Sequence, residues 1–420
     1  MTHHDHIPSA PLSHLPPDGT AQRAQRLSDE HGAYRARCLN LIASENVISD
    51  AVARAATGDL EGRYADFTGT DLGARKYRGG RYVVKSEELC SQLVRETFGA
   101  PACELRAISG HVAGNAVLMG LCRPGDLVME VGQEGGGHRL AAKLAEAPLV
   151  DLRVKFLPFD PIAFNVDADV AAAAIEAARP RVVVLGSSTF LHPHPVAELA
   201  AVCARVGATL VYDASHVMGL IAAGRFQDPL REGADIVFGS THKTLFGPQG
   251  GVIFGRQDVV DLASAGLYPP LVTNHHPFRI PALTVALAEH AAFGAAYADA
   301  VIANARAFAS TLADRGIKVV GGGTDSHAVL VATPGKRGAD VAGALEDQGI
   351  ITNPSRLPGA HGGEGFRVGV QELTRRGGDE TAAREAAAIV AAALEGIAVS
   401  DDVTRLAARL QDVHYTWAAA

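Results

Sequence analysis

Long apolar runs are missing from this sequence of 420 residues. None approaches the roughly 20 residues that a membrane-spanning helix needs. The first twenty residues have no apolar segment behind a basic start, so we expect no signal peptide. The formal net charge of −8 is modest, which argues against nucleic acid or an anionic membrane as the main partner. We therefore expect neither a membrane nor a nucleic acid among its partners.

Cysteines and aromatic residues are also scarce. The five cysteines are scattered without a CxxC pair, so we predict no metal site and favour a reduced, cytoplasmic protein over a disulfide-linked one. Aromatic residues make up 5% of the chain, which gives no sign of an aromatic cage around a substrate. Any chemistry must therefore be sought in polar side chains that the fold brings together.

What the sequence does contain is a regular alternation of short apolar segments and helical stretches. The stretches at 166–178 and 196–206 have helical length and composition. Strands rich in Val, Ile and Leu that alternate with helices are typical of an α/β fold whose mostly parallel sheet is covered on both faces. We predict strands at 127–131, 152–156, 181–185, 209–212, 235–238 and 251–254.

This pattern breaks near residues 274–281, where a long alanine-rich helix begins and a smaller α+β unit follows. The segments predicted for that unit are 317–320, 328–332, a helix at 339–348, 366–370 and a final helix near 379–395. We predict a disordered Pro-rich tail at 1–20, an N-terminal arm with the large domain at 21–280, and an interdomain helix with the small domain at 281–420.

Two segments, TLVYDASHVMGL and DIVFGSTHKTLFGPQGG, place polar residues after predicted strands. Asp213 ends one strand, and Lys243 follows the next. Ligands of open α/β sheets bind outside the carboxyl ends of the strands. A pyridoxal enzyme needs a lysine for its Schiff base and an acid that keeps the pyridine nitrogen protonated. We therefore predict pyridoxal 5′-phosphate on Lys243 with Asp213 beneath the ring, His216 near the ring hydroxyl, and Ser240, Thr241 and His242 around the lysine.

The segment AISGHVAGN opens a predicted helix directly after a strand-like stretch. A helix N-terminus offers free N–H groups and a favourable dipole to an anion. Ser109 and Gly110 are therefore candidates for binding the cofactor phosphate, although an ordinary helix cap has the same pattern.

The motifs LIASENVISDAV, YDASHVMGLIAAGRF, STHKTLFGPQGG and FRVGVQELTRRG, in this order and spacing, resemble the serine hydroxymethyltransferase family. The resemblance runs from about residue 39 to 378. It implies a fold-type-I pyridoxal-phosphate transferase that forms a homodimer with shared active sites. It also implies that Ser44 and Arg367 bind the substrate carboxylate, and that Tyr64 reaches the neighbouring subunit's cofactor phosphate.

Departures from the family pattern bear on the reaction. The usual glutamate of YAEG is Asp66, the paired tyrosines are Tyr77-Arg78, and the stretch that helps to hold the folate pterin is shortened to GGGHRLAAKLAEAPLVDL. The phosphate-binding Gly-Gly of the partner subunit is replaced around His276, and the arginine after GP is Gln249. Several of these features resemble the threonine transaldolase branch of the family.

That branch implies retro-aldol cleavage of L-threonine and transfer of the glycyl unit to an aldehyde acceptor, giving a β-hydroxy-α-amino acid without folate. A base must take the β-hydroxyl proton. Asp66 and His138 are both candidates, and His138 could instead stack on the cofactor ring. The alternatives are a tetrahydrofolate-dependent serine hydroxymethyltransferase, a folate-free threonine or α-methylserine aldolase, an aminotransferase, and a non-catalytic pyridoxal-binding protein.

Overall fold

The computed structural model describes residues 17–358, 361 and 363–418. Its centre is a seven-stranded sheet in the order β2-β10-β9-β8-β7-β3-β4, in which β10 runs antiparallel to both of its neighbours and the other pairings are parallel. All six predicted strands are present, which confirms the mostly parallel α/β sheet. The strands of this sheet are β2 (Ala102–Glu104), β3 (Leu127–Glu130), β4 (Arg153–Phe156), β7 (Val182–Leu185), β8 (Thr209–Asp213), β9 (Ile236–Ser240) and β10 (Gly251–Gly255).

Both faces of the sheet are buried. Along β7, Val182 and Val184 belong to one apolar cluster, and Val183 and Leu185 belong to another. Successive side chains of a strand point to opposite faces, so the two clusters are the two sides of the sheet. One side is covered by α4 (Gly110–Leu121) and α9 (Gln257–Leu267), and the other by α6 (Ala168–Ala178) and α7 (Val196–Val206).

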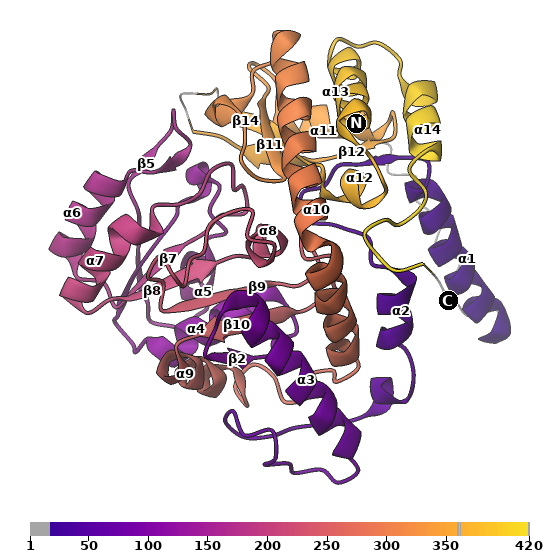
Figure 1. The fold of residues 1–420 in the computed structure, drawn as a ribbon. Helices are drawn as coiled ribbons and strands as arrows, with labels where there is room; N and C mark the ends of the chain where they lie inside the picture. The colour runs from indigo at the N-terminus through magenta and orange to yellow at the C-terminus, as the bar shows by residue number, and fades with distance from the viewer. Residues whose placement is uncertain (1–16, 359–360, 362, 419–420) are drawn as a thin grey trace.

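The small domain is joined to the large one by α10 (Arg279–Asp314), which runs past both (Figure 1). Of the described helices, α10 alone is long and apolar enough to span a membrane, but many of its residues are buried within the protein. The domain contains the antiparallel sheet β11-β14-β13 and the short β12. Its elements are β11 (Ala328–Ala332), α11 (Gly338–Glu346), β12 (Ile350–Ile351), β13 (Asn353–Arg356), β14 (Glu364–Gly369), α12 (Gln371–Arg375), α13 (Glu380–Leu394) and α14 (Ser400–Ala408).

Two details of this domain differ from prediction. The segment predicted at 317–320 forms only a single bridge, Val319 with Val331, because a 3₁₀ turn begins at Val320 and Gly321 has a positive φ of 73°. The helix expected to be the last, α13, is followed by α14.

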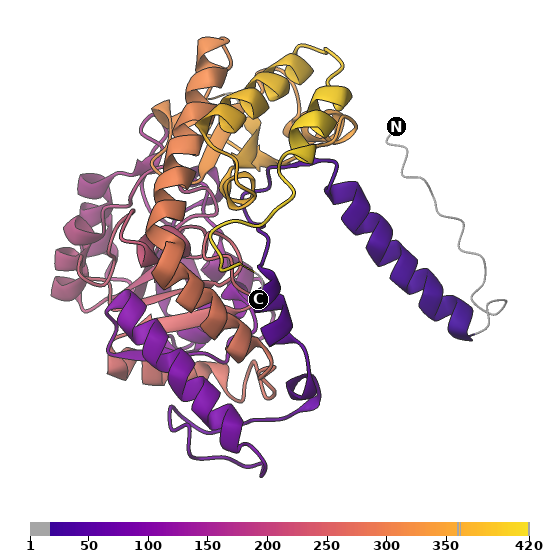
Figure 2. The ribbon, with the colours of Figure 1, turned by 45° about the vertical axis from the view of Figure 1, so that its right-hand side comes forward.

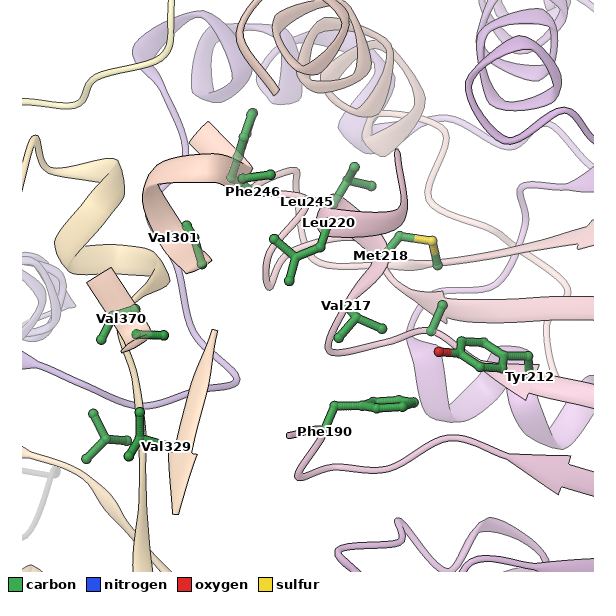
Figure 3. Packing of buried hydrophobic residues seen from close by; sticks show 14 of the residues in the cluster. Phe190, Tyr212, Val217, Met218, Leu220, Leu245, Phe246, Val301, Val329 and Val370 are labelled. Carbon is green, nitrogen blue, oxygen red and sulfur yellow. The ribbon is translucent and has the colours of Figure 1, made fainter. Parts of the chain in front are cut away.

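The two domains share one apolar core. Figure 3 shows side chains of that core, from Tyr212 on β8 and Phe190 to Val329 on β11 and Val370 before α12. The strand ends of the large sheet therefore face a wall formed by the small domain.

The N-terminal arm comprises α1 (Pro17–Arg35), β1 (Leu39–Asn40), α2 (Asp50–Ala56) and α3 (Arg81–Phe98). We grouped the arm with the large domain, but β1 pairs in parallel with β12 of the small domain. Helix α1 stands away from the body of the protein (Figure 2), and nearly all of its residues are exposed. It begins at Pro17, whereas residues 1–16 of the predicted tail lie outside the described residues.

The remaining short elements connect these units. They are α5 (Leu140–Ala145), β5 (Phe159–Asp160), β6 (Asn165–Val166) and α8 (Met218–Ala222).

Candidate active site

The lysine and the acid predicted to bind the cofactor meet at one edge of the sheet. Asp213 ends β8 and Ser240 ends β9, and these strands are parallel neighbours. Lys243 follows three residues later and is half-buried. Burial lowers the pKa of the Lys243 amine to about 8, Asp213 opposes this shift, and Arg367 adds to it. The three groups therefore interact, and the lysine is poised to lose its proton near neutral pH.

Asp213 is held in a tight environment. It is buried, and its Oδ1 accepts a hydrogen bond of 2.9 Å from the Ser215 amide. Gly186 follows β7 with a φ of 124°, and a Cβ at this position would lie 2.7 Å from the Asp213 Cβ. Only glycine fits there, because a side chain would meet both the strained backbone and the aspartate.

A small polar cluster forms where the N-terminus of α4 meets the end of β9. Ser109 caps α4 by accepting a hydrogen bond of 3.1 Å from the Val112 amide. An added Cβ at Gly110 would clash with the Ser240 hydroxyl and lie 3.0 Å from the Ser215 hydroxyl. Ser215 also accepts a hydrogen bond of 3.1 Å from the Ser240 amide. Two hydroxyls and a helix N-terminus thus surround a space that exists only because residue 110 is glycine, which suits a phosphate.

Four imidazoles flank this edge in two pairs. His216 Nδ1 lies 3.4 Å from Nε2 of His327, with the rings stacked, and His138 Nε2 lies 3.3 Å from Nδ1 of His111. Burial lowers the pKa of His138 to about 4 and holds that of His216 well below its usual range. Both rings are therefore neutral at physiological pH.

Arg367 and His138 line one cavity of about 240 Å³. Arg367 is buried on β14, where it donates to the Ser188 carbonyl, and its Nε has no partner among the described residues. Burial lowers its pKa to about 10, so it remains a cation. His138 Nδ1 lies 3.4 Å from the Ser188 hydroxyl. A fixed guanidinium with an unused donor suits a substrate carboxylate.

A second cavity, of about 700 Å³, is lined by Ser44, His242 and His276 together with Arg279. Nδ1 of His242 and Nη1 of Arg279 are buried without partners among the described residues. Burial lowers the pKa of His242 to about 4. Ser44 and Arg367 were predicted to bind the same carboxylate, but they line different cavities, so the role of Ser44 stays a prediction.

Tyr64 and Asp66 line neither cavity. Tyr64 is 53% exposed and its ring packs against Tyr77. Asp66 is buried with one oxygen unpartnered among the described residues, and burial raises the pKa of its carboxyl against the opposing charges of Lys76 and Arg106. Within one chain, neither residue therefore shares a cavity with Arg367 or with His242.

Some residues of the site differ from expectation or were missed. Thr241 donates 2.6 Å to the Pro248 carbonyl, so its hydroxyl braces the lysine loop. Ser215 was not predicted to belong to the site, although it lies between the predicted residues Asp213 and His216. His111, Ser188 and His327 were also missed. His111 lies in the segment AISGHVAGN and Ser188 follows the predicted strand 181–185, whereas His327, in the small domain, had no comparable signal.

The described residues fit pyridoxal phosphate. That group needs an amine, an acid for its pyridine nitrogen and donors for its phosphate. Lys243 would supply the amine and Asp213 the acid, and the cluster of Gly110, Ser215 and Ser240 would supply a phosphate cradle, which a Cβ at position 110 would fill. When bound, the cofactor supplies an electron sink for negative charge at the substrate α-carbon.

Comparison with known sequences agrees with this geometry. Residues 21–390 match the model of the family described as serine hydroxymethyltransferase. The serine hydroxymethyltransferase of Methanopyrus kandleri is 40% identical over 403 residues, which cover 93% of this chain and 94% of that protein. That of Pyrococcus horikoshii is 41% identical over 374 residues, covering 86% and 87%.

A solved structure is similar over nearly the whole fold. The L-threonine transaldolase from Pseudomonas fluorescens, in its internal aldimine state, superposes with a TM-score of 0.88 at 29% identity and covers 94% of each chain. The predicted resemblance and cofactor are thereby confirmed. The chain belongs to the serine hydroxymethyltransferase family and is a pyridoxal-phosphate-dependent transferase of fold type I.

Proposed function

We propose that this protein cleaves L-threonine between Cα and Cβ and transfers the glycyl unit to an aldehyde, without folate. The observation that carries this proposal is the composition of the cavity beside Arg367. The shortened stretch after Gly137, where relatives by resemblance hold the folate pterin, contributes His138, Arg139 and Lys143 to its wall. Similarity to a solved threonine transaldolase supports the same reading.

Each residue of the site has a part in this chemistry. Arg367 binds the amino-acid carboxylate and fixes the orientation of the Cα–Cβ bond. The Asp213 carboxylate would pair with the pyridine nitrogen of the bound cofactor and so favour the protonated form of the ring. Lys243 would hold the cofactor through its amine when no substrate is bound. His138, neutral and supported by His111 and Ser188, can accept the β-hydroxyl proton or hold the ring in place.

Asp66 remains a second candidate for the base. It can serve only if it enters the active site of another chain, because it lines no cavity with Arg367 in its own. We therefore propose a homodimer in which Tyr64 and Asp66 complete the neighbouring site. We also propose that this enzyme is cytoplasmic, since its cysteines favour a reducing compartment.

The decisive experiment measures acetaldehyde released from L-threonine by the cofactor-loaded protein in the absence of folate, with and without a panel of aldehydes. The expected result is acetaldehyde release that rises with an acceptor, together with a new β-hydroxy-α-amino acid. No cleavage of threonine, but tetrahydrofolate-dependent conversion of serine to glycine, would instead identify a hydroxymethyltransferase. Relatives about 40% identical bear that name.

A further inference from the structure

We infer that the aldehyde acceptor carries an anionic group, a carboxylate or a phosphate, which binds to Arg139, Lys143 and Arg356. This inference rests on the proposed transaldolase function and names the class of its second substrate. It concerns the part of the active-site cavity that lies beyond the amino-acid carboxylate.

The charge of the cavity exceeds what an amino acid requires. Its lining contains four cationic side chains, Arg367, Arg139, Lys143 and Arg356, and no Asp or Glu is among the described residues that line it. One guanidinium is sufficient for one α-carboxylate. Three cations are therefore left over, and gathering them around an empty space costs electrostatic repulsion unless an anion binds there.

Internal carboxylates neutralise these three cations only in part. Arg139 pairs at 2.9 Å with Glu146, which is largely exposed and lies outside the cavity. The side chains of Lys143 and Arg356 make no ion pair or hydrogen bond with any described residue. The buried Glu130 carboxylate interacts with the charges of Arg139 and Lys143, but it accepts two hydrogen bonds from amides at the start of α5 and does not line the cavity.

The backbone of Arg139 has an unusual conformation. Its φ of 57° and ψ of 46° lie in the left-handed region, which an arginine rarely adopts. Gly136, three residues earlier, also has a positive φ, of 78°, which a glycine adopts at no cost. Strain of this kind is typical of side chains that are held for a function.

Arg356 sets the position of the anionic group. Strand β13 begins at Asn353, whose side chain lies 3.4 Å from Arg367, and ends at Arg356. Three residues of extended strand span about 10 Å. The anionic group is thus bound away from the amino-acid carboxylate, toward the far end of β13.

An adjoining cavity offers room for that connecting body. It has a volume of about 710 Å³ and shares Gln133, Arg139 and Arg356 with the first. Phe156 and Phe159 form an apolar wall, and a Cβ at Gly135 would lie 2.6 Å from the Phe159 ring. Glu134 also lines this cavity, so the body that fits is planar and apolar, with its anionic end directed toward Arg139 and Arg356.

The test compares acceptors that differ only in charge. With L-threonine and the cofactor-loaded enzyme, 4-formylbenzoate is compared with its neutral methyl ester, and glycolaldehyde phosphate with glycolaldehyde. We expect kcat/KM for the anionic member of at least one pair to be about tenfold higher or more. The pair that shows the preference distinguishes a carboxylate from a phosphate.

Substitutions in the cavity test which residues cause the preference for an anionic acceptor. Arg356→Gln and Lys143→Gln should each reduce the ratio of anionic to neutral kcat/KM severalfold. Lys155→Gln removes the same charge from the exposed edge of β4, outside both cavities, and should leave the ratio unchanged. Equal use of charged and neutral acceptors by an enzyme that cleaves threonine would overturn this inference and leave the proposed function standing.

A binding measurement separates the two proposals further. Terephthalate has no aldehyde, and saturating glycine occupies Arg367, so calorimetry of terephthalate in the presence of glycine reports only the second anion site. We expect binding to the unmodified enzyme that weakens severalfold in Arg356→Gln but not in Lys155→Gln. Failure to bind terephthalate and inorganic phosphate, whether or not threonine is cleaved, would overturn the anion site itself.

Discussion

The end of the central sheet and the N-terminal segment at residues 63–78 both carry predicted functional residues, but they differ in how those residues are held. At the sheet, Asp213, Lys243 and Arg367 interact with one another inside one chain. In the segment, Tyr64 is exposed and Asp66 is buried away from both cavities. The first region is assembled within a single chain, whereas we propose that the second acts in the active site of another copy.

The largest effect is expected at the sheet. Lys243→Ala removes the amine that holds the cofactor, so activity with threonine should fall below detection and the protein-bound absorbance near the visible should disappear. Borohydride reduction followed by mass spectrometry checks the assignment. A cofactor still reduced onto the variant protein would mean that another lysine is used.

Mixing two inactive variants tests whether the segment at residues 63–78 acts in its own chain or in another copy. Lys243→Ala and the double variant Tyr64→Phe, Asp66→Asn should each be inactive or nearly so. If the segment acts on the other subunit, equal amounts that exchange subunits should recover about a quarter of the wild-type activity, because half of the dimers contain one intact site. Recovery is measured as acetaldehyde release after the variants are mixed under conditions that allow exchange.

The outcome decides between two arrangements. An inactive mixture whose subunits have exchanged, as shown by differently tagged copies, would place Tyr64 and Asp66 in the site of their own chain. A double variant with full activity would leave His138 as the candidate base.

A smaller effect is expected at Arg367. Arg367→Ala should weaken threonine binding by about 2–5 kcal/mol, because it truncates a buried charge that pairs with the substrate carboxylate. Arg367→Lys keeps the positive charge but loses the bidentate geometry, so its affinity for threonine should lie between those of the alanine variant and the unmodified enzyme. Spectroscopic titration with threonine and with glycine measures both, and unchanged affinity in the alanine variant would place the carboxylate elsewhere, with Ser44 as the first candidate.

The difference between the two regions also explains what the sequence could predict. Asp213 and Lys243 follow from the fold, because parallel neighbouring strands bring their carboxyl ends to one edge. His327 could not be found in this way, since its contact with His216 depends on how the small domain packs against the large one. The same limit applies to Ser44 and Asp66, whose predicted roles came from resemblance and which do not line the cavity of Arg367.

The pKa of the Lys243 amine provides a further test of the site at the end of the sheet. Burial lowers the pKa of its amine to about 8. Because only the neutral amine is nucleophilic, modification of the cofactor-free protein by trinitrobenzenesulfonate should accelerate as the pH rises through about 8, well below the range of an ordinary lysine near 10.4. Mass spectrometry of the peptide that contains Lys243 gives the rate at each pH.

Two variants test the cause of this shift with opposite signs. The Asp213 carboxylate raises the pKa of Lys243 and the Arg367 guanidinium lowers it. The midpoint should therefore move to lower pH in Asp213→Asn and to higher pH in Arg367→Gln. The Tyr64→Phe, Asp66→Asn variant should leave the midpoint in place, because neither residue is among the charges that shift this amine within its own chain. A midpoint that moves in this variant, with a monomeric sample as the control, would show that the segment of a second chain reaches the lysine even before the cofactor binds.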